Sequence, residues 1–244
     1  MAWLWLLLCL GAGTAHATPA PRSTVQLVQV RLNDHAPARP SALRAWAQEV
    51  RLRTSVRIAH ESSPVRAESP TLLRYPLLIL AGDGALGAVS NVAAARLREH
   101  LSSGGLLIVD DVSQSGPSPS FDRDVRRLVK RVLGQGLRPV PSNDVVYRTF
   151  YRLAQPFGRR ADVRILEGVQ VGKRWAVLYC RNDLLGAFSQ STSGGPALPV
   201  LPGGERQREL AWRLGINLVV YAVSLNYKDD HTHVGHLLRR RRGR

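Results

Sequence analysis

Residues 75–84 read YPLLILAGDG and residues 106–111 read LLIVDD. Each stretch is a run of large apolar residues that ends in a turn carrying Asp. Such runs are typical of strands in a parallel sheet, because helices cover these strands on both faces. A helical pattern lies between them, with Ser90 as its expected N-cap and Gly104-Gly105 at its end. Together they predict a β–α–β unit at the centre of an α/β protein.

The same alternation continues upstream of this unit. Residues 24–32 (TVQLVQVRL) and 55–60 (SVRIAH) are rich in β-branched and apolar residues, which predicts two further strands. Apolar residues at helical spacing between these strands predict a helix over residues 41–53, with Ser41 as its N-cap.

Downstream, residues 121–133 carry an apolar stripe at helical spacing and a basic outer face, which predicts an amphipathic helix. Residues 163–171 and 173–180 predict two strands joined at Gly172, as in a hairpin. Residues 205–224 predict the last helix. The whole pattern predicts a single-domain, three-layer α/β sandwich with a mostly parallel sheet.

The composition is that of a globular protein. The chain has 244 residues, of which 44% are hydrophobic and 21% are charged, and this excludes a disordered or collagen-like protein. No apolar run reaches the roughly 18 residues that cross a bilayer, which excludes a polytopic membrane protein. Two Cys are too few for a disulfide scaffold. The formal net charge of +16 predicts attraction to anionic surfaces, with weak specificity.

The N-terminal segment has the pattern of a secretory signal peptide. Residues 1–17 (MAWLWLLLCLGAGTAHA) hold an apolar run and end in Ala15-His16-Ala17, a small-x-small cleavage site. A short membrane anchor or a buried strand is the alternative. We therefore expect an exported protein, periplasmic or associated with the cell envelope, with no membrane span after cleavage. Residues 18–23 are then a short linker, and residues 24–227 form the folded domain.

The C-terminal residues 228–244 are a basic tail. The unbroken run of Arg239, Arg240, Arg241 and Arg242 predicts weak contact with anionic surfaces, and a solvated tail is the alternative. Asp and His are also dense in this tail, but their spacing matches no closed structural zinc motif. These residues are Asp229, Asp230, His231, His233 and His236. We therefore expect no metal and no cofactor.

Acidic residues follow several of the predicted strands. In open α/β sheets, ligands bind beyond the carboxyl ends of the strands, so the acidic side chains are expected to meet there. They could cap helices and pair with arginines, bind a ligand or a divalent cation through oxygen, or form an acid/base pair. The candidate catalytic residues are Asp83, Asp110 and Asp111. The candidate ligand-binding residues are Asp110, Asp111, Asn182, Asp183 and Arg123, and Arg181 is a further hydrogen-bond donor.

Other chemistry has little support in the sequence. The chain contains no phosphate-binding loop, no dinucleotide-binding motif, no G-x-S-x-G elbow and no H-E-x-x-H. Cys180 lies in a strand pattern, which indicates a buried and inert thiol. The aromatic residues of the later segments could line a carbohydrate-binding surface, although packing in the core is the more frequent role. They are Tyr147, Phe150, Tyr151 and Trp175.

Six segments, in their order and spacing, resemble the bacterial family called domain of unknown function 4159 (DUF4159). They begin at Tyr75 (YPLLILAGDG), Leu97 (LREHLSSGGLLIVDD), Phe121 (FDRDVRRLVKRVL), Val145 (VVYRTFYRL), Leu166 (LEGVQVGKRWAVLYCRNDLLGAF) and Gly203 (GGERQRELAWRLGINLVVYAVSLNYKDD). The resemblance implies a flavodoxin-like fold similar to that of class I glutamine amidotransferases. Those enzymes use a Cys on a sharp turn after a strand. Here such turns carry Asp83 and Asp110-Asp111 instead, so the nucleophile is expected to be absent.

The sequence favours a non-enzymatic binding or interaction module of the bacterial cell envelope, whose partner is an envelope protein or glycan. The alternative is a hydrolase or metal-dependent enzyme that uses the strand-end Asp residues. Nucleic-acid binding is a third and weaker hypothesis. Export argues against it, and no stacking motif accompanies the basic residues.

Overall fold

The structure is a computed structural model. It describes residues 24–33, 38–61 and 63–241, with side chains through Ser224. The strands are β1 (Val28–Arg31), β2 (Val65–Arg66), β3 (Leu77–Gly82), β4 (Leu106–Asp111), β5 (Arg138–Pro139), β6 (Glu167–Val171) and β7 (Arg174–Cys180). The helices are α1 (Pro40–Arg53), α2 (Asn91–Ser102), α3 (Pro119–Leu133), α4 (Leu184–Phe188) and α5 (Gly204–Arg241), and two short 3₁₀ helices are η1 (Pro70–Arg74) and η2 (Val145–Tyr147).

The strands form one sheet in the order β2-β1-β3-β4-β7-β6-β5. The first five strands of this order are parallel, and β6 and β5 extend the sheet in antiparallel fashion. At the centre, β3 pairs with β4 from Leu77 opposite Leu106 to Gly82 opposite Asp111. The predicted α/β class with a mostly parallel sheet is therefore confirmed.

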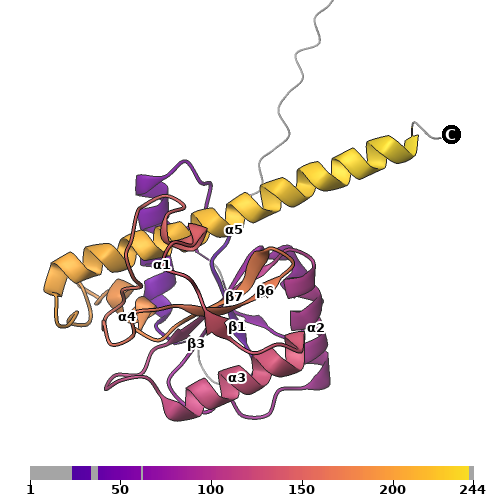
Figure 1. The fold of residues 1–244 in the computed structure, drawn as a ribbon. Coiled ribbons are helices and arrows are strands. Elements are labelled where there is room, and N and C mark those ends of the chain that lie inside the picture. The colour runs from indigo at the N-terminus through magenta and orange to yellow at the C-terminus, as the bar shows by residue number, and fades with distance from the viewer. Residues whose placement is uncertain (1–23, 34–37, 62, 242–244) are drawn as a thin grey trace, which may run out of the picture.

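Helices cover both faces of the sheet (Figure 1). Alternate residues of β4 enter two separate cores, because successive side chains in a strand point to opposite faces. Leu106 and Ile108 join the core beneath α1, α4 and α5, while Leu107 and Val109 join the core beneath α2 and α3. The first core contains Trp46, whose ring centroid lies 5.3 Å from that of Phe188.

Two predictions near the N-terminus are wrong. Residues 55–60 do not form a strand: Ile58 makes one isolated bridge with Val25, and β2 pairs with β1 instead. The predicted cap of α1 is also wrong, because Arg39 occupies the N-cap in a left-handed conformation and Pro40 begins the helix. Proline suits the first helical position, where its missing N–H has no helical acceptor. The hydroxyl of Ser41 instead accepts a hydrogen bond from Gln190 N–H at 3.1 Å.

In the C-terminal half, several helices and strands begin or end at residues other than those predicted. The hairpin at Gly172 is present, with φ of 63° at that glycine, but β6 begins only at Glu167. The short helix α4 follows β7 directly, where no helix was predicted. Helix α5 continues to Arg241, past the predicted end at Ser224, and it projects beyond the domain in Figure 1.

Ser90 caps α2 as predicted. Its hydroxyl oxygen accepts a hydrogen bond from Ala93 N–H at 3.0 Å and donates one to Glu68 at 2.9 Å. A Ser90→Ala variant is expected to lose about 1 kcal/mol of the free energy of unfolding, since an N-cap satisfies a helix N–H that has no other acceptor. Urea denaturation measures this loss. Ser102→Ala, at the exposed end of the same helix, is the matched control and should change stability by less than about 0.5 kcal/mol.

Candidate functional site

Three of the predicted acidic residues meet at the carboxyl edge of the sheet. Asp110 and Asp111 end β4, and Asp183 follows β7, whose Cys180 lies opposite Asp110. All three acidic side chains are buried. Each of their carboxyl oxygens accepts at least one hydrogen bond from the protein itself. The geometry therefore matches the alternative in which these residues cap helices and pair with arginines.

Asp111 fixes both ends of the loop between β4 and α3. Its Oδ1 accepts hydrogen bonds from the N–H and the hydroxyl of Ser113, and its Oδ2 accepts one from Ser118 N–H at 2.6 Å. Ser118 then caps α3, because its hydroxyl oxygen accepts a hydrogen bond from Phe121 N–H at 3.3 Å. One carboxylate thus holds residues 113–118 in a closed loop.

Asp110 and Asp183 hold the start of α4. The two oxygens of Asp110 accept hydrogen bonds from Leu184 N–H at 2.9 Å and Leu185 N–H at 2.8 Å. Asp183 is the N-cap, with φ of 53°, and its Oδ1 accepts a hydrogen bond from Gly186 N–H at 2.8 Å. Asp tolerates this left-handed conformation better than most residues. The carboxylates therefore explain why a five-residue helix is stable at this point.

Two arginines from distant parts of the chain compensate these negative charges. Arg159 Nε donates to Asp183 Oδ2, and its Nη2 donates to the backbone carbonyls of residues 113–114 at 3.1 and 2.9 Å. Arg39 Nη2 lies 3.3 Å from the same carboxylate. Arg159 therefore connects the acidic cluster to the loop that Asp111 closes.

Burial shifts the pKa values of two of the acids in this cluster. Burial raises the pKa of Asp110 to about 7, and the negative charges of Asp183 and Asp111 act in the same direction. Burial also raises the pKa of Asp183, although the guanidinium groups of Arg159 and Arg39 oppose the rise. Asp110 therefore takes up a proton near neutral pH, where an ordinary aspartate stays ionised.

Asn182 positions a neighbouring loop. Its Oδ1 accepts a hydrogen bond from Val163 N–H at 2.9 Å, and its Nδ2 donates to the carbonyls of Val163 and Pro156 at 2.8 and 3.2 Å. Gly158 packs so closely that a Cβ there would lie 2.2 Å from the Asn182 carbonyl oxygen. Both amide donors of Asn182 are used, so its observed contacts are structural.

Asp83 differs from the other acids. It is exposed, and its carboxylate makes no hydrogen bond or ion pair with the described residues. It lines a cavity of about 380 Å³ at the carboxyl ends of β1 and β3, together with Arg31 and Asn33. Arg31 Nε is shut off from solvent here and has no hydrogen-bond partner in the described part of the chain. The structure thus places Asp83 beside an open cavity and the other acids beneath the surface.

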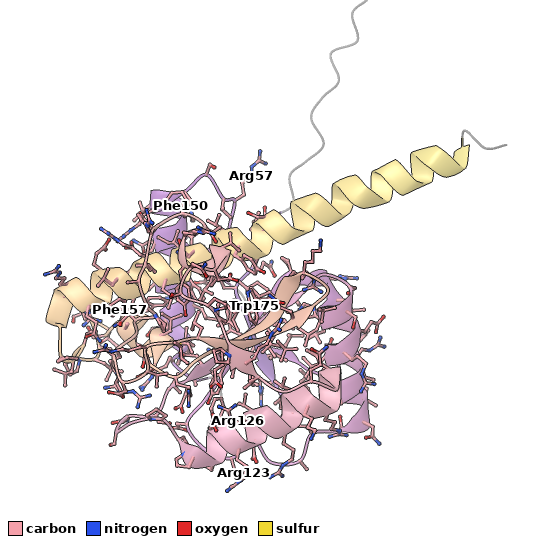
Figure 2. All side chains as sticks on the ribbon, viewed as in Figure 1. Arg57, Arg123, Arg126, Phe150, Phe157 and Trp175 are labelled. Atoms are coloured by element: carbon pink, nitrogen blue, oxygen red, sulfur yellow. The ribbon has the colours of Figure 1, made fainter. Side chains whose placement is uncertain are left out.

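The two further arginines proposed from the sequence lie elsewhere. Arg123 is 66% exposed on the outer side of α3, where it lies 3.9 Å from Asp124 (Figure 2). Arg181 pairs with Glu167 at 3.0 Å. The structure therefore does not bring Arg123 to the acidic cluster, because the helix turns this position toward solvent.

The aromatic residues and the thiol occupy ordinary packing positions. Tyr147 and Trp175 are buried in the core, whereas Phe150 is 47% exposed. They therefore do not form one carbohydrate-binding surface with Tyr151, which packs against Phe150. Cys180 is buried, and burial raises its pKa well above the usual value. The prediction of an inert, buried thiol agrees with this environment.

Some predictions concern residues that the structure does not describe. The signal peptide, residues 1–17, and the side chains of the Asp/His-rich and Arg-rich tail are outside the described residues. Within the described ones, no three His, Cys, Asp or Glu side chains are grouped to hold a metal ion. The helices of the same residues include none with the length and apolar character needed to span a membrane.

The sequence analysis missed the arginines that complete the cluster. Arg39, Arg159 and Arg160 all lie in loops or at a helix start, where no periodicity marks a buried side chain. Their only shared signal is position, because each lies near a Pro or Gly that begins or bends a segment. That signal does not separate a buried arginine from an exposed one.

These features define an α/β protein whose mostly parallel sheet carries a buried charged network and an open cavity at its carboxyl edge. The chain belongs to the family described as domain of unknown function DUF4159, whose model matches residues 26–223, most of the chain. The predicted family is confirmed. A comparison with curated proteins gives no match.

Proposed function

We propose that this chain is a non-enzymatic ligand-binding module of the bacterial cell envelope. The observation that carries the proposal is the cavity at the carboxyl ends of β1 and β3, whose lining includes the oppositely charged residues Asp83 and Arg31. The parallel strand order β2-β1-β3-β4-β7 supports a flavodoxin-like fold similar to that of class I glutamine amidotransferases. In such a sheet, the strand order reverses between β1 and β3, and ligands bind at this point.

The lining of the cavity suggests the class of ligand. Asp83 offers a carboxylate that has no partner among the described residues, and Arg31 brings positive charge to the same lining. A small zwitterion, such as an amino acid or a short peptide fragment, would place its amino group near the first and its carboxylate near the second. The volume of about 380 Å³ is in the range of small-molecule sites.

Catalysis has less support than binding. An amidotransferase would need a nucleophilic Cys on a turn after a strand, and the turns after β3 and β4 carry Asp83 and Asp110-Asp111. Cys180 is buried within the core and its raised pKa keeps it protonated. A hydrolase or metal-dependent enzyme would need accessible carboxylates, yet Asp110 and Asp111 are fully occupied by N–H and O–H donors.

The support for the proposed compartment and partner comes from the sequence alone. The signal-peptide pattern of residues 1–17 supports export to the periplasm or cell envelope. The positive charge of the chain, with its Arg239–Arg242 run, supports weak contact with anionic surfaces. An envelope protein or glycan is then the partner.

Thermal unfolding in the presence of defined probes tests the proposal. L-glutamine and D-alanyl-D-alanine are expected to raise the Tm of the full chain, whereas neutral glucose is not. A ligand at a hundred times its Kd adds about 2.7 kcal/mol to stability. Asp83→Asn and Arg31→Met should abolish the rise. Arg57→Met should retain it, because Arg57 points into solvent at the far end of the molecule (Figure 2).

The same samples test the absence of catalysis. Release of ammonia from L-glutamine is expected to stay at the level of the buffer. Ammonia release that depends on Asp83 or Asp110 would reject the non-enzymatic proposal. A Tm rise that persists in both cavity variants would reject this cavity as the binding site.

A further inference from the structure

A buried arginine beside the charged cluster keeps unused hydrogen-bond donors. The Arg160 side chain is only 7% exposed. Its Nη2 donates to the carbonyls of Arg181 at 2.9 Å and Asp111 at 3.5 Å. Its Nε and Nη1 are shut off from solvent and make no hydrogen bond with the described part of the chain. Buried polar groups almost always have partners, and a charged donor without one points to a missing acceptor.

The carboxylate that comes nearest to these donors does not satisfy them. Asp162 Oδ2 lies 3.6 Å from Arg160 Nη1, which is beyond hydrogen-bond distance, and the Asp162 side chain is 50% exposed. By contrast, the neighbouring Arg159 donates to a buried carboxylate and to two carbonyls. The two adjacent arginines therefore differ in role: Arg159 pairs with a buried carboxylate, and Arg160 has no such partner among the described residues.

The unused donors lie beneath a polar loop. A Cβ added to Gly116 would come within 3.8 Å of Arg160 Nη1, so the tip of loop 113–118 covers the guanidinium. The ends of the loop are held by Asp111, but residues 114–116 donate no backbone hydrogen bond to the described residues. Gln114 and Ser115 are exposed at the tip. The loop can therefore supply further N–H donors to a group that enters beside Arg160.

The buried acids nearby do not compensate Arg160 directly. Arg39 and Arg159 both pair with the Asp183 carboxylate, whereas Arg160 Nη2 donates to the backbone carbonyl of Asp111 and not to its carboxylate. The carboxylates of Asp110 and Asp111 accept their hydrogen bonds from backbone N–H groups and the Ser113 hydroxyl. An oxyanion beside Nε and Nη1 would supply the acceptor that these acids do not.

We propose that Arg160 and the loop 113–118 bind an oxyanion, the phosphate or carboxylate group of a ligand, at a site separate from the cavity of β1 and β3. The guanidinium supplies Nε and Nη1, and the loop supplies the N–H groups of residues 114–116. Charge-assisted hydrogen bonds from Arg to such oxygens are among the strong ones in proteins. The site does not depend on the zwitterion proposed above.

Calorimetric titration of the full chain tests this site. Sodium phosphate and sodium acetate are titrated separately at pH 7 and constant ionic strength, with sodium chloride as the reference. Saturable binding of phosphate, of acetate or of both supports the site, and the comparison shows which oxyanion it accepts. Failure of both anions to bind beyond the chloride reference overturns the proposal.

Three variants locate the binding. Arg160→Met should weaken it at least tenfold. Asp162→Asn should tighten it severalfold, because it removes the negative charge that competes for Nη1. Arg57→Met, which removes an exposed arginine, should leave it unchanged. Equal affinity in the wild type and Arg160→Met overturns the proposal. If Arg160→Met does not fold, then Asp162→Asn decides, and unchanged or weaker binding in that variant overturns it.

Discussion

An Arg159→Met variant is expected to lose about 3–5 kcal/mol of the free energy of unfolding at pH 7. Methionine keeps much of the apolar volume of the side chain but removes its charge. Asp183 then remains buried with only Arg39 beside it, and two carbonyls of the loop lose their donor. A domain of this kind is stable by about 5–15 kcal/mol in total, so the loss is a large part of its stability.

The loss should grow with pH. Burial raises the pKa of Asp183 in the folded chain, and Arg159 opposes that rise. Without Arg159 the pKa rises further. A carboxyl group whose pKa is raised by folding favours the folded state at low pH, and this contribution is lost as the pH increases through the folded pKa. The variant should therefore be more destabilised at pH 8 than at pH 5.

Urea denaturation at both pH values measures this effect. Arg44→Met is the matched control, because Arg44 pairs with Glu61 on the surface, where the two side chains are 62% and 68% exposed. Exposed pairs contribute about 0–1 kcal/mol, so this control should change little at either pH. An Arg159→Met protein as stable as the Arg44→Met protein would show that the buried pair does not hold the loop and α4 in place.

The centre of the fold follows directly from the sequence. The apolar runs of β3 and β4 predict strands covered on both faces, and the structure places them side by side with Leu77 opposite Leu106. Ser90 was also predictable, because an N-cap depends on its own helix alone. Local chemistry decides these features, so one sequence suffices to find them.

The edges of the fold depend on partners that lie far away in the chain. The pattern of residues 55–60 suits a strand, yet their pairing is limited to one bridge with Val25. The helix α4 has too few residues for a periodic signal, and it begins where Asp110 and Asp183 supply acceptors for its first N–H groups. No local pattern contains that information.

The candidate site was likewise only partly predictable from the sequence. The acidic strand ends were predicted to meet, and Asp110, Asp111 and Asp183 do meet, because parallel strands end at the same edge. Their arginine partners were not predicted. Arg159 and Arg160 are adjacent and chemically identical, yet Arg159 pairs with the buried Asp183, whereas Nε and Nη1 of Arg160 have no hydrogen-bond partner among the described residues. Only the positions of loop 113–118 and Asp183 separate their roles.

A second large effect is expected from a buried histidine on the opposite face of the sheet. His100 of α2 is 2% exposed, and its Nε2 has no hydrogen-bond partner in the described residues. Gly105 makes this burial possible, because a Cβ at that position would lie 2.2 Å from the imidazole ring. Burial lowers the pKa of His100 to about 4, and the positive charge of the nearby Arg174 lowers it as well. A hydrogen bond with the backbone of Leu106 acts in the opposite direction.

The consequence is a loss of stability in mild acid. Well above pH 6.5 the imidazole is neutral in the folded and the unfolded chain, so it has no effect on pH dependence there. Between pH 6.5 and about 4 only the unfolded chain takes up the proton, which favours unfolding. The full contribution is about 3 kcal/mol, at about 1.4 kcal/mol for each pH unit of the shift.

A His100→Gln variant isolates this contribution. Glutamine is polar and does not titrate, so the free energy of unfolding should fall less between pH 7 and pH 4 than it does in the wild type, by about 3 kcal/mol. The carboxylates titrate in both proteins and cancel in the comparison. His60→Gln, at an exposed position, should keep the pH dependence of the wild type. If His100→Gln keeps it too, then His100 is already protonated in the folded chain, and the close contact with Gly105 must open in acid.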